Sequence, residues 1–225
     1  MDNLILRAFL GFAFLMFVLA LALFVPAGTL AFWQAWLYLA VFAGCTIAIT
    51  VYLARHDRTL LAGRVQAGPV AETQHSQQII QGIASILFVL VYIVAGLDFR
   101  FHWSSLSPVL SIVAEGFVIL GFWFVFLVFR ENSFTRGTID VSVGQKVVSS
   151  GPYRIVRHPM YAGASVLLLA TPLALGSLAA LPLPIPLILV VAIRARAEEE
   201  FLTANLDGYA EYCQKVRYRL IPNVW

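Results

Sequence analysis

The chain has 225 residues, of which 60% are hydrophobic and only 12% are charged. A soluble domain is roughly half apolar and about a quarter charged, so this composition excludes an ordinary soluble protein and indicates an integral membrane protein. The net charge of +3 does not point to nucleic acid, because the basic residues cluster at the ends of apolar runs. Cys45 and Cys213 make neither a disulfide framework nor a zinc set, and the scattered histidines His56, His75 and His102 suggest no metal site.

The first half of the chain predicts four membrane-spanning helices. A spanning helix needs about 20 mainly apolar residues, and such runs cover about 4–25, 33–54, 78–97 and 108–130. The first run is longer than the typical ~7–15 residue core of a signal peptide, so we expect a retained helix. The polar loop 55–77 contains glycines and a proline and is interpreted as a connector.

The last third predicts a helical hairpin. A fifth span covers about 160–178, with Pro172 as an expected kink, and a sixth covers about 183–197. The purely apolar part of the sixth, Ile185 to Ile193, is too short to cross a bilayer alone, so its second arm is expected to emerge as a polar helix. The predicted fold is therefore all-α: one domain, residues 1–225, forming a polytopic membrane bundle of five or six transmembrane helices with a cytoplasmic C-terminal segment.

Lysine and arginine predict the orientation, because they concentrate in cytoplasmic loops. With the N-terminus inside, 14 of the 15 basic residues lie on the cytoplasmic side and only Arg100 lies outside. Both large polar segments, 131–159 and 194–225, then share that side, and both termini are cytoplasmic if there are six spans. The 14 are Arg7, Arg55, Arg58, Arg64, Arg130, Arg136, Lys146, Arg154, Arg157, Arg194, Arg196, Lys215, Arg217 and Arg219.

The stretch "GPYRIVRHPMYAG", residues 151–163, concentrates polar chemistry at the predicted start of the fifth span. Pro159 is suited to the first position of a helix, which places His158 at the entrance, where unpaired backbone N–H groups can hold an anion. Tyr161 and Gly163 fall in the first turn, and the missing side chain of Gly163 would let a planar ligand approach. On another interpretation, the arginines are cytoplasmic anchors and Tyr161 is an interfacial aromatic residue.

The stretch "RARAEEEFL" begins where the last apolar run ends. Arg194 and Glu198 are four residues apart, and Arg196 and Glu199 three, so each pair can meet on a helix. A salt-bridged helix start explains one or two carboxylates. Three adjacent acids, including Glu200, repel one another, and a cationic ligand group would relieve that repulsion.

Three other features have open interpretations. The tail 208–222, with Tyr209 and Tyr212 one helical turn apart, is either a basic amphipathic surface segment or a lid over a cytoplasmic cavity. The segment 129–140 is interpreted as a polar cap of the fourth span. Glu115 is an acid within that span, where acids are functional candidates by default, but its distance from the cytoplasmic clusters favours a structural hydrogen bond.

The order of these motifs resembles the isoprenylcysteine carboxyl methyltransferase family and the related phospholipid methyltransferases. The matching pattern is GPY-x3-RHP-x-Y-x-G, an apolar hairpin, EEEFL, GY-x2-Y and RLIP, over about 148–225. The segment 131–148 resembles the preceding segment of bacterial members, so the resembling block is about 131–225. The first two spans carry no specific match.

The resemblance implies a membrane-embedded methyltransferase that uses S-adenosyl-L-methionine and methylates a lipophilic or small-molecule acceptor, with a carboxylate as the favoured acceptor group. It implies a location in a bacterial inner membrane, among membrane lipids, and leaves the oligomeric state open. Arg194 and Glu199 are the expected catalytic residues. The expected cofactor-binding residues are Tyr153, His158, Pro159, Tyr161, Gly163, Glu198 and Glu199.

The positions at which this sequence departs from the motifs of related families help to choose among the alternative functions. Phospholipid N-methyltransferases are expected to carry Gly-x-Gly before the acidic pair, and the sequence "ALGSLAALPLPIP" lacks it, which favours the isoprenylcysteine type. An NADPH-dependent sterol-type reductase shares the RH-x-x-Y-x-G motif and a tyrosine-rich tail, but tends to carry Asn and an acid where this chain has Met160 and Ala164. A non-enzymatic scaffold or transporter would leave the two cytoplasmic motifs without a shared purpose.

Overall fold

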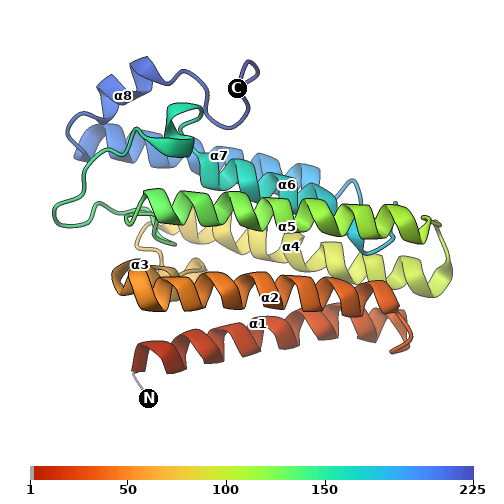
Figure 1. Cartoon of the computed structure of the whole chain (residues 1–225). Coiled ribbons are helices and arrows are strands. Elements are labelled where there is room, and N and C mark those ends of the chain that lie inside the picture. The colour runs from red at the N-terminus through yellow and green to blue at the C-terminus, as the bar shows by residue number, and fades with distance from the viewer. Residues whose placement is uncertain (1–2) are drawn as a thin grey trace.

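The computed structural model describes residues 3–225, and its regular elements are all helical (Figure 1). Six long helices lie side by side along one axis, and shorter helices gather at one end of the bundle. The long helices are α1 (Asn3–Ala27), α2 (Trp33–His56), α4 (His75–Phe101), α5 (Pro108–Glu131), α6 (Pro159–Ala174) and α7 (Pro184–Asn205). The short elements are α3 (Arg58–Val65), η1 (Pro69–Ala71), η2 (Gly151–Arg154) and α8 (Tyr209–Lys215). The predicted all-α membrane bundle is confirmed.

Four helices, α1, α2, α4 and α5, are long and apolar enough to cross a membrane. They correspond to the four spans predicted in the first half of the chain. The fifth predicted span is shorter than expected: α6 has 16 residues, or about 24 Å at 1.5 Å per residue. Pro172 lies in its last turn, so the proline marks the helix end and not a kink in mid-span.

A glycine end motif explains where α6 stops. Gly176 has a φ of +73°, a conformation that glycine adopts without strain. Its N–H donates to Leu173 C=O at 3.0 Å, and the next N–H, of Ser177, donates to Pro172 C=O at 2.8 Å. These two bonds form a Schellman motif, which turns the chain toward α7.

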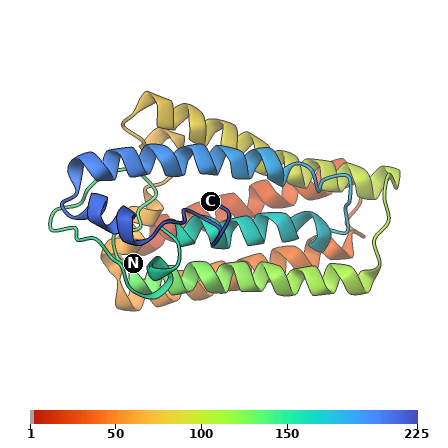
Figure 2. The same cartoon turned by 90° about the horizontal axis from the view of Figure 1, so that it is seen from above.

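The predicted hairpin is present, and its second arm leaves the apolar region as expected. Helix α7 continues past the last apolar residues to Asn205 and carries the arginines and glutamates of its second half. Figure 2 shows α6 and α7 running alongside one another, with the C-terminal segment crossing over α6.

The polar segments of the chain meet at one end of the bundle. Arg64 of α3 donates to Arg136 C=O at 3.1 Å, and Arg194 of α7 pairs with Glu72 at 2.6 Å. The loop 55–77 is therefore more than the connector that its composition suggested: it contains α3 and a buried acid.

The other end of the bundle is closed by Asp98 of α4. Its carboxylate accepts hydrogen bonds from both the N–H and the hydroxyl of Ser104, and from the hydroxyl of Ser177. This carboxylate ties the loop before α5 to the turn after α6.

The bundle interior contains a few polar groups among aromatic and aliphatic side chains. The hydroxyl of Tyr38 bonds those of Tyr92, at 2.8 Å, and Thr171, at 3.2 Å. Glu115 is also buried, but neither of its carboxylate oxygens has a hydrogen-bond partner among residues 3–225. The expected structural hydrogen bond of Glu115 is therefore wrong for the part of the chain that the structure describes, because no donor lies within bonding distance of its carboxylate.

Helices α5 and α6 approach closely because glycines lie in their interface. A Cβ on Gly121 would come within 2.8 Å of Leu167 Cβ and 3.0 Å of the Gly163 carbonyl oxygen, and a Cβ on Gly163 would meet Phe124 at 2.9 Å. Small residues at such contacts are typical of membrane helix pairs. This contact fixes the position of the first turn of α6.

We predict that Gly121→Ala loosens the α5–α6 contact. Overpacking costs about 1–3 kcal/mol, which corresponds to a melting temperature lower by roughly 2–10 °C in a chain of this size. The measurement is thermal unfolding in detergent. Gly116→Ala, on an exposed position of α5 with no atom within 4 Å of the new Cβ, is the matched control and should not be destabilised. Equal melting temperatures for the two variants would contradict the prediction.

Candidate active site

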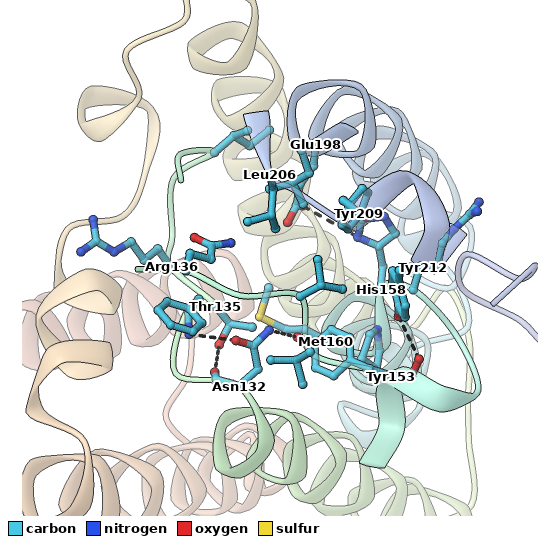
Figure 3. A pocket seen from close by; sticks show the side chains of 18 of the residues that line it. Asn132, Thr135, Arg136, Tyr153, His158, Met160, Glu198, Leu206, Tyr209 and Tyr212 are labelled. Atoms are coloured by element: carbon cyan, nitrogen blue, oxygen red, sulfur yellow. Dashed lines mark hydrogen bonds and ion pairs between the residues drawn. The ribbon is translucent and has the colours of Figure 1, made fainter. Parts of the chain in front are cut away.

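A cavity opens at the polar end of the bundle, between the segment 132–148, the start of α6, the end of α7 and α8 (Figure 3). Glu198 and Leu206 lie on one wall, Asn132 and Thr135 on the opposite one, and His158, Tyr153 and Tyr212 to one side. The lining residues are Asn132, Phe134, Thr135, Arg136, Thr138, Ile139, Asp140, Gln145, Lys146, Val147, Val148, Tyr153, Arg157, His158, Pro159, Met160, Tyr161, Glu198, Leu202, Leu206, Tyr209 and Tyr212.

A tight turn before α6 aims Tyr153 at the cavity. Gly151 has a φ of +53°, a conformation that favours glycine, and a Cβ there would displace the end of the Glu131 side chain, 2.8 Å away. Ser150 donates its hydroxyl to the same carboxylate. The Tyr153 hydroxyl then accepts a hydrogen bond from the Asn132 side-chain amide at 3.0 Å.

The C-terminal tail covers one side of the cavity. The N–H groups of Arg157 and His158 donate to the carbonyls of Tyr218 and Arg219, each at 2.9 Å. Helix α8 places Tyr212 in the wall, where its hydroxyl donates to Tyr153 C=O at 2.8 Å. Of the two interpretations of the tail, this geometry favours the lid.

The three adjacent glutamates have three different environments. Glu198 lines the cavity, accepts a hydrogen bond from the Tyr161 hydroxyl at 2.8 Å and lies 3.9 Å from His158 Nδ1. Glu199 is buried and lies outside the lining. Glu200 is exposed.

Glu199 is the centre of a buried ionic cluster. Its carboxylate lies 2.7 Å from Arg157 Nε, 2.8 Å from Arg219 Nε and 3.2 Å from His158 Nε2. The Arg157 Nε–H does not point at the carboxylate, so that contact is an ion pair without a hydrogen bond. Burial opposes ionisation of Glu199, but the hydrogen bonds from His158 and Arg219 and the charge of Arg157 hold its pKa below the ordinary value.

The salt bridges expected within α7 are not those that form. Arg196 stacks over the Trp225 ring, 5.6 Å from its centroid, and Glu199 pairs with arginines from other segments. The hydroxyl of Tyr161 lies between Arg194 and Glu198, accepting from the first at 3.2 Å and donating to the second. Arg194 and Glu199 take tertiary partners because their side chains are turned into the protein, whereas Arg196 lies on an exposed position.

The structure brings together most of the predicted site residues. Tyr153, His158, Pro159, Tyr161 and Glu198 line the cavity. Glu199 and Arg194 lie behind the wall, each in contact with a lining residue. Gly163 lies against Phe124, in the helix contact, and so does not face the cavity where a planar ligand was expected to approach.

Sequence reasoning missed two sets of residues. The segment 132–148 forms a whole wall of the cavity, although 129–140 was interpreted as a helix cap. Its resemblance to the corresponding segment of bacterial family members was one hint. Its polarity next to a span was another, but a cap explains that polarity equally well. Arg157 was weighed as an exposed anchor, yet its side chain is 9% exposed and ion-paired. Arg154 is exposed, as an anchor would be.

The tyrosines of the wall are neutral hydrogen-bonding groups. Burial raises the pKa of Tyr153 and of Tyr209 above the ordinary value for tyrosine, 10.0. They therefore present aromatic faces and hydroxyl groups at neutral pH, and no tyrosinate base.

We predict that the ionic cluster makes stability depend on Glu199 in acid. The pKa of Glu199 lies below 4.5 in the folded protein, so its ionised form stabilises the fold above about pH 4.5 and this stabilisation is lost as the pH falls through the folded pKa. Glu199→Gln should lower the melting temperature at pH 7 and flatten its fall as the pH drops below about 4.5. Glu200→Gln is the control and should behave as the wild type. A wild-type-like acid profile in Glu199→Gln would contradict the assignment.

Comparison with known proteins agrees with the motif analysis. A model of the phospholipid methyltransferase family matches residues 109–207. A delta(14)-sterol reductase of Mus musculus is 36% identical over 91 residues, which are 39% of this chain and 22% of the reductase. The chain thus covers less than a quarter of that relative's length. The resemblance to membrane methyltransferases is confirmed for the part of the chain that builds most of the cavity, because residues 109–207 match the phospholipid methyltransferase family.

Proposed function

We propose that the protein transfers a methyl group from S-adenosylmethionine to a lipophilic carboxylate at the membrane surface. One observation carries the proposal. Every residue that lines the cavity, except Tyr209 and Tyr212, falls within the segment that matches the methyltransferase family. The cavity is thus the feature that the family match and the structure have in common.

The lining residues fit the chemistry of S-adenosylmethionine. This cofactor is a zwitterion at its amino-acid end and carries a sulfonium. Glu198 and Asp140 suit the ammonium or ribose hydroxyls, and Arg136 and Lys146 suit the carboxylate. Five aromatic side chains line the same cavity, and aromatic faces attract cations; they are Phe134, Tyr153, Tyr161, Tyr209 and Tyr212.

The cofactor supplies a methyl group that is already activated for transfer, so the protein needs mainly to position the acceptor and exclude water. The tail and α8 cover the cavity and limit access of water. His158 is held by Glu199, which fixes its ring beside Glu198 and Tyr161. A carboxylate acceptor needs no general base, which agrees with a wall whose tyrosines are neutral.

An apolar groove offers a place for the lipid part of the acceptor. The groove lies between α5, α6 and the tail, and its lining includes Phe124, Ala162, Gly163 and Leu220. The first turn of α6 faces both sites, because Tyr161 lines the cavity while the next two residues line the groove. A chain lying in the groove would bring a terminal carboxylate toward the cavity.

Glu198→Gln should weaken binding of S-adenosylhomocysteine. A hydrogen bond to a charged group contributes about 1.5–3 kcal/mol, so the expected loss is roughly tenfold or more. Titration calorimetry in detergent measures it, with Glu200→Gln as the control on the exposed side of the same helix. Normal affinity of Glu198→Gln in a folded protein would remove Glu198 from the site.

The acceptor is tested by transfer of a labelled methyl group. The panel holds a prenylcysteine, an isoprenoid or fatty acid, a lipid amine and a small thiol. We expect label in base-labile ester form on the lipophilic carboxylates. Label only on the amine or the thiol would overturn the carboxylate proposal while leaving methyl transfer intact.

The second candidate is an NADPH-dependent reductase of the sterol type, which the similarity to the sterol reductase favours. However, Met160 and Ala164 of this chain depart from the reductase pattern. The same calorimetry with NADPH separates the two: tight NADPH binding without a response to S-adenosylhomocysteine would select the reductase. Binding of neither ligand would favour a scaffold or transporter.

A further inference from the structure

A chain of three polar contacts connects the loop before α4 to the cavity. Arg194 Nη2 lies 2.6 Å from Glu72 Oε1. Arg194 Nε donates to the Tyr161 hydroxyl at 3.2 Å, and that hydroxyl donates to Glu198 Oε2 at 2.8 Å. Glu198 lines the cavity, whereas Glu72 and Arg194 do not.

Glu72 is rigidly held. It is 4% exposed, and its carboxylate also accepts hydrogen bonds from the Gln81 side chain at 2.6 Å and from the Ile139 N–H at 3.4 Å. The carboxylate therefore joins helix α4, helix α7 and the cavity wall around Ile139. A buried carboxylate with these partners has a fixed direction.

Arg194 is occupied by the protein itself. A guanidinium carries five N–H groups, and Arg194 donates four hydrogen bonds: to Tyr161, to Gln77 Oε1 at 3.2 Å, to Glu72 and to Gly137 C=O at 3.0 Å. Arg194 was expected to be catalytic, but in this arrangement its donors point at protein groups. Its side chain is 11% exposed, and a buried cation needs a partner charge, which Glu72 supplies.

The direction of the Tyr161 hydroxyl follows from Arg194. A tyrosine hydroxyl has one proton to donate. Because Arg194 donates to the oxygen, the proton is left for another acceptor, and Glu198 is the acceptor within reach. Arg194 thereby fixes the Glu198 carboxylate at the cavity edge through Tyr161.

We propose that Glu72 is a positioning residue for the cavity: by holding Arg194, it orients Tyr161 and hence Glu198. Glu72, Gln77 and Gln81 lie before residue 109, outside the segment that matches the family. The N-terminal part of the chain therefore supplies contacts that hold the site in place, although the residues that line the cavity come from later in the chain. The proposal rests on the proposed function only for the name of the ligand.

A double-mutant cycle tests this proposal. The variants are Glu72→Gln, Tyr161→Phe and their combination, and the readout is affinity for S-adenosylhomocysteine by calorimetry in detergent. Residues that act through one another give non-additive effects. We expect Glu72→Gln to weaken binding roughly five- to tenfold in the wild-type background and less than about twofold in the Tyr161→Phe background.

Gln78→Ala is the control for loop stability. Gln78 donates to the backbone carbonyl of Glu72 at 2.9 Å, so its loss loosens the same loop without removing the charge that faces Arg194. It should lower the melting temperature and leave affinity within about twofold of wild type. An unchanged affinity in Glu72→Gln, or an equal loss in both backgrounds, would overturn the positioning role.

The cycle also distinguishes this proposal from the proposed function. If the wild type binds NADPH and not S-adenosylhomocysteine, the methyltransferase proposal fails, and the same cycle is measured with NADPH. Non-additivity with either ligand supports the role of Glu72, because the contacts end at a cavity residue whichever ligand is bound.

Discussion

The burial of Glu199 among Arg157, His158 and Arg219 is the constraint on which the polar end of this protein depends. A buried carboxylate is stable only when paired, and its partners come from two places: Arg157 and His158 directly before α6, and Arg219 in the tail. One side chain of α7 thus holds together two other parts of the chain that are far apart in the sequence. The cavity lies beside this cluster, and Arg157 and His158 belong to both.

Much of the fold follows directly from the lengths of the apolar runs in the sequence. The four spans of the first half and the hairpin of the last third were predictable, because a bilayer demands about 20 apolar residues of a helix. The end of α6 was less so: the Schellman motif at Gly176 depends on a turn geometry that hydropathy does not report. The meeting of Glu198, Tyr161 and His158 at one cavity was predictable from motif order, since their segments were expected on the same membrane face.

The remaining residues of the site carried no usable pattern. Asn132 and Glu72 are single polar residues in polar loops, and nothing local distinguishes them from solvent-exposed ones. Their importance comes from partners far along the chain, Tyr153 and Arg194. The partner of Glu199 was predicted wrongly because a local pattern was present and misleading. Spacing on α7 suggested Arg196, but Glu199 pairs with Arg157 and Arg219 from other segments. Spacing on a helix shows which side chains can pair within that helix. Which pairs form depends on which side chains are buried against other segments.

The short length of α6 affects how deep in the membrane the cavity lies. At about 24 Å, it falls short of a hydrocarbon core of about 30 Å, and its far end is tied to the turn that Asp98 holds. If that turn lies at one surface of the bilayer, the opposite end of α6, with His158 and Tyr161, is recessed below the other surface. A lipid head group would then reach the cavity by sinking only to the depth of the first carbons of its own acyl chain. The lipid would not have to leave the membrane.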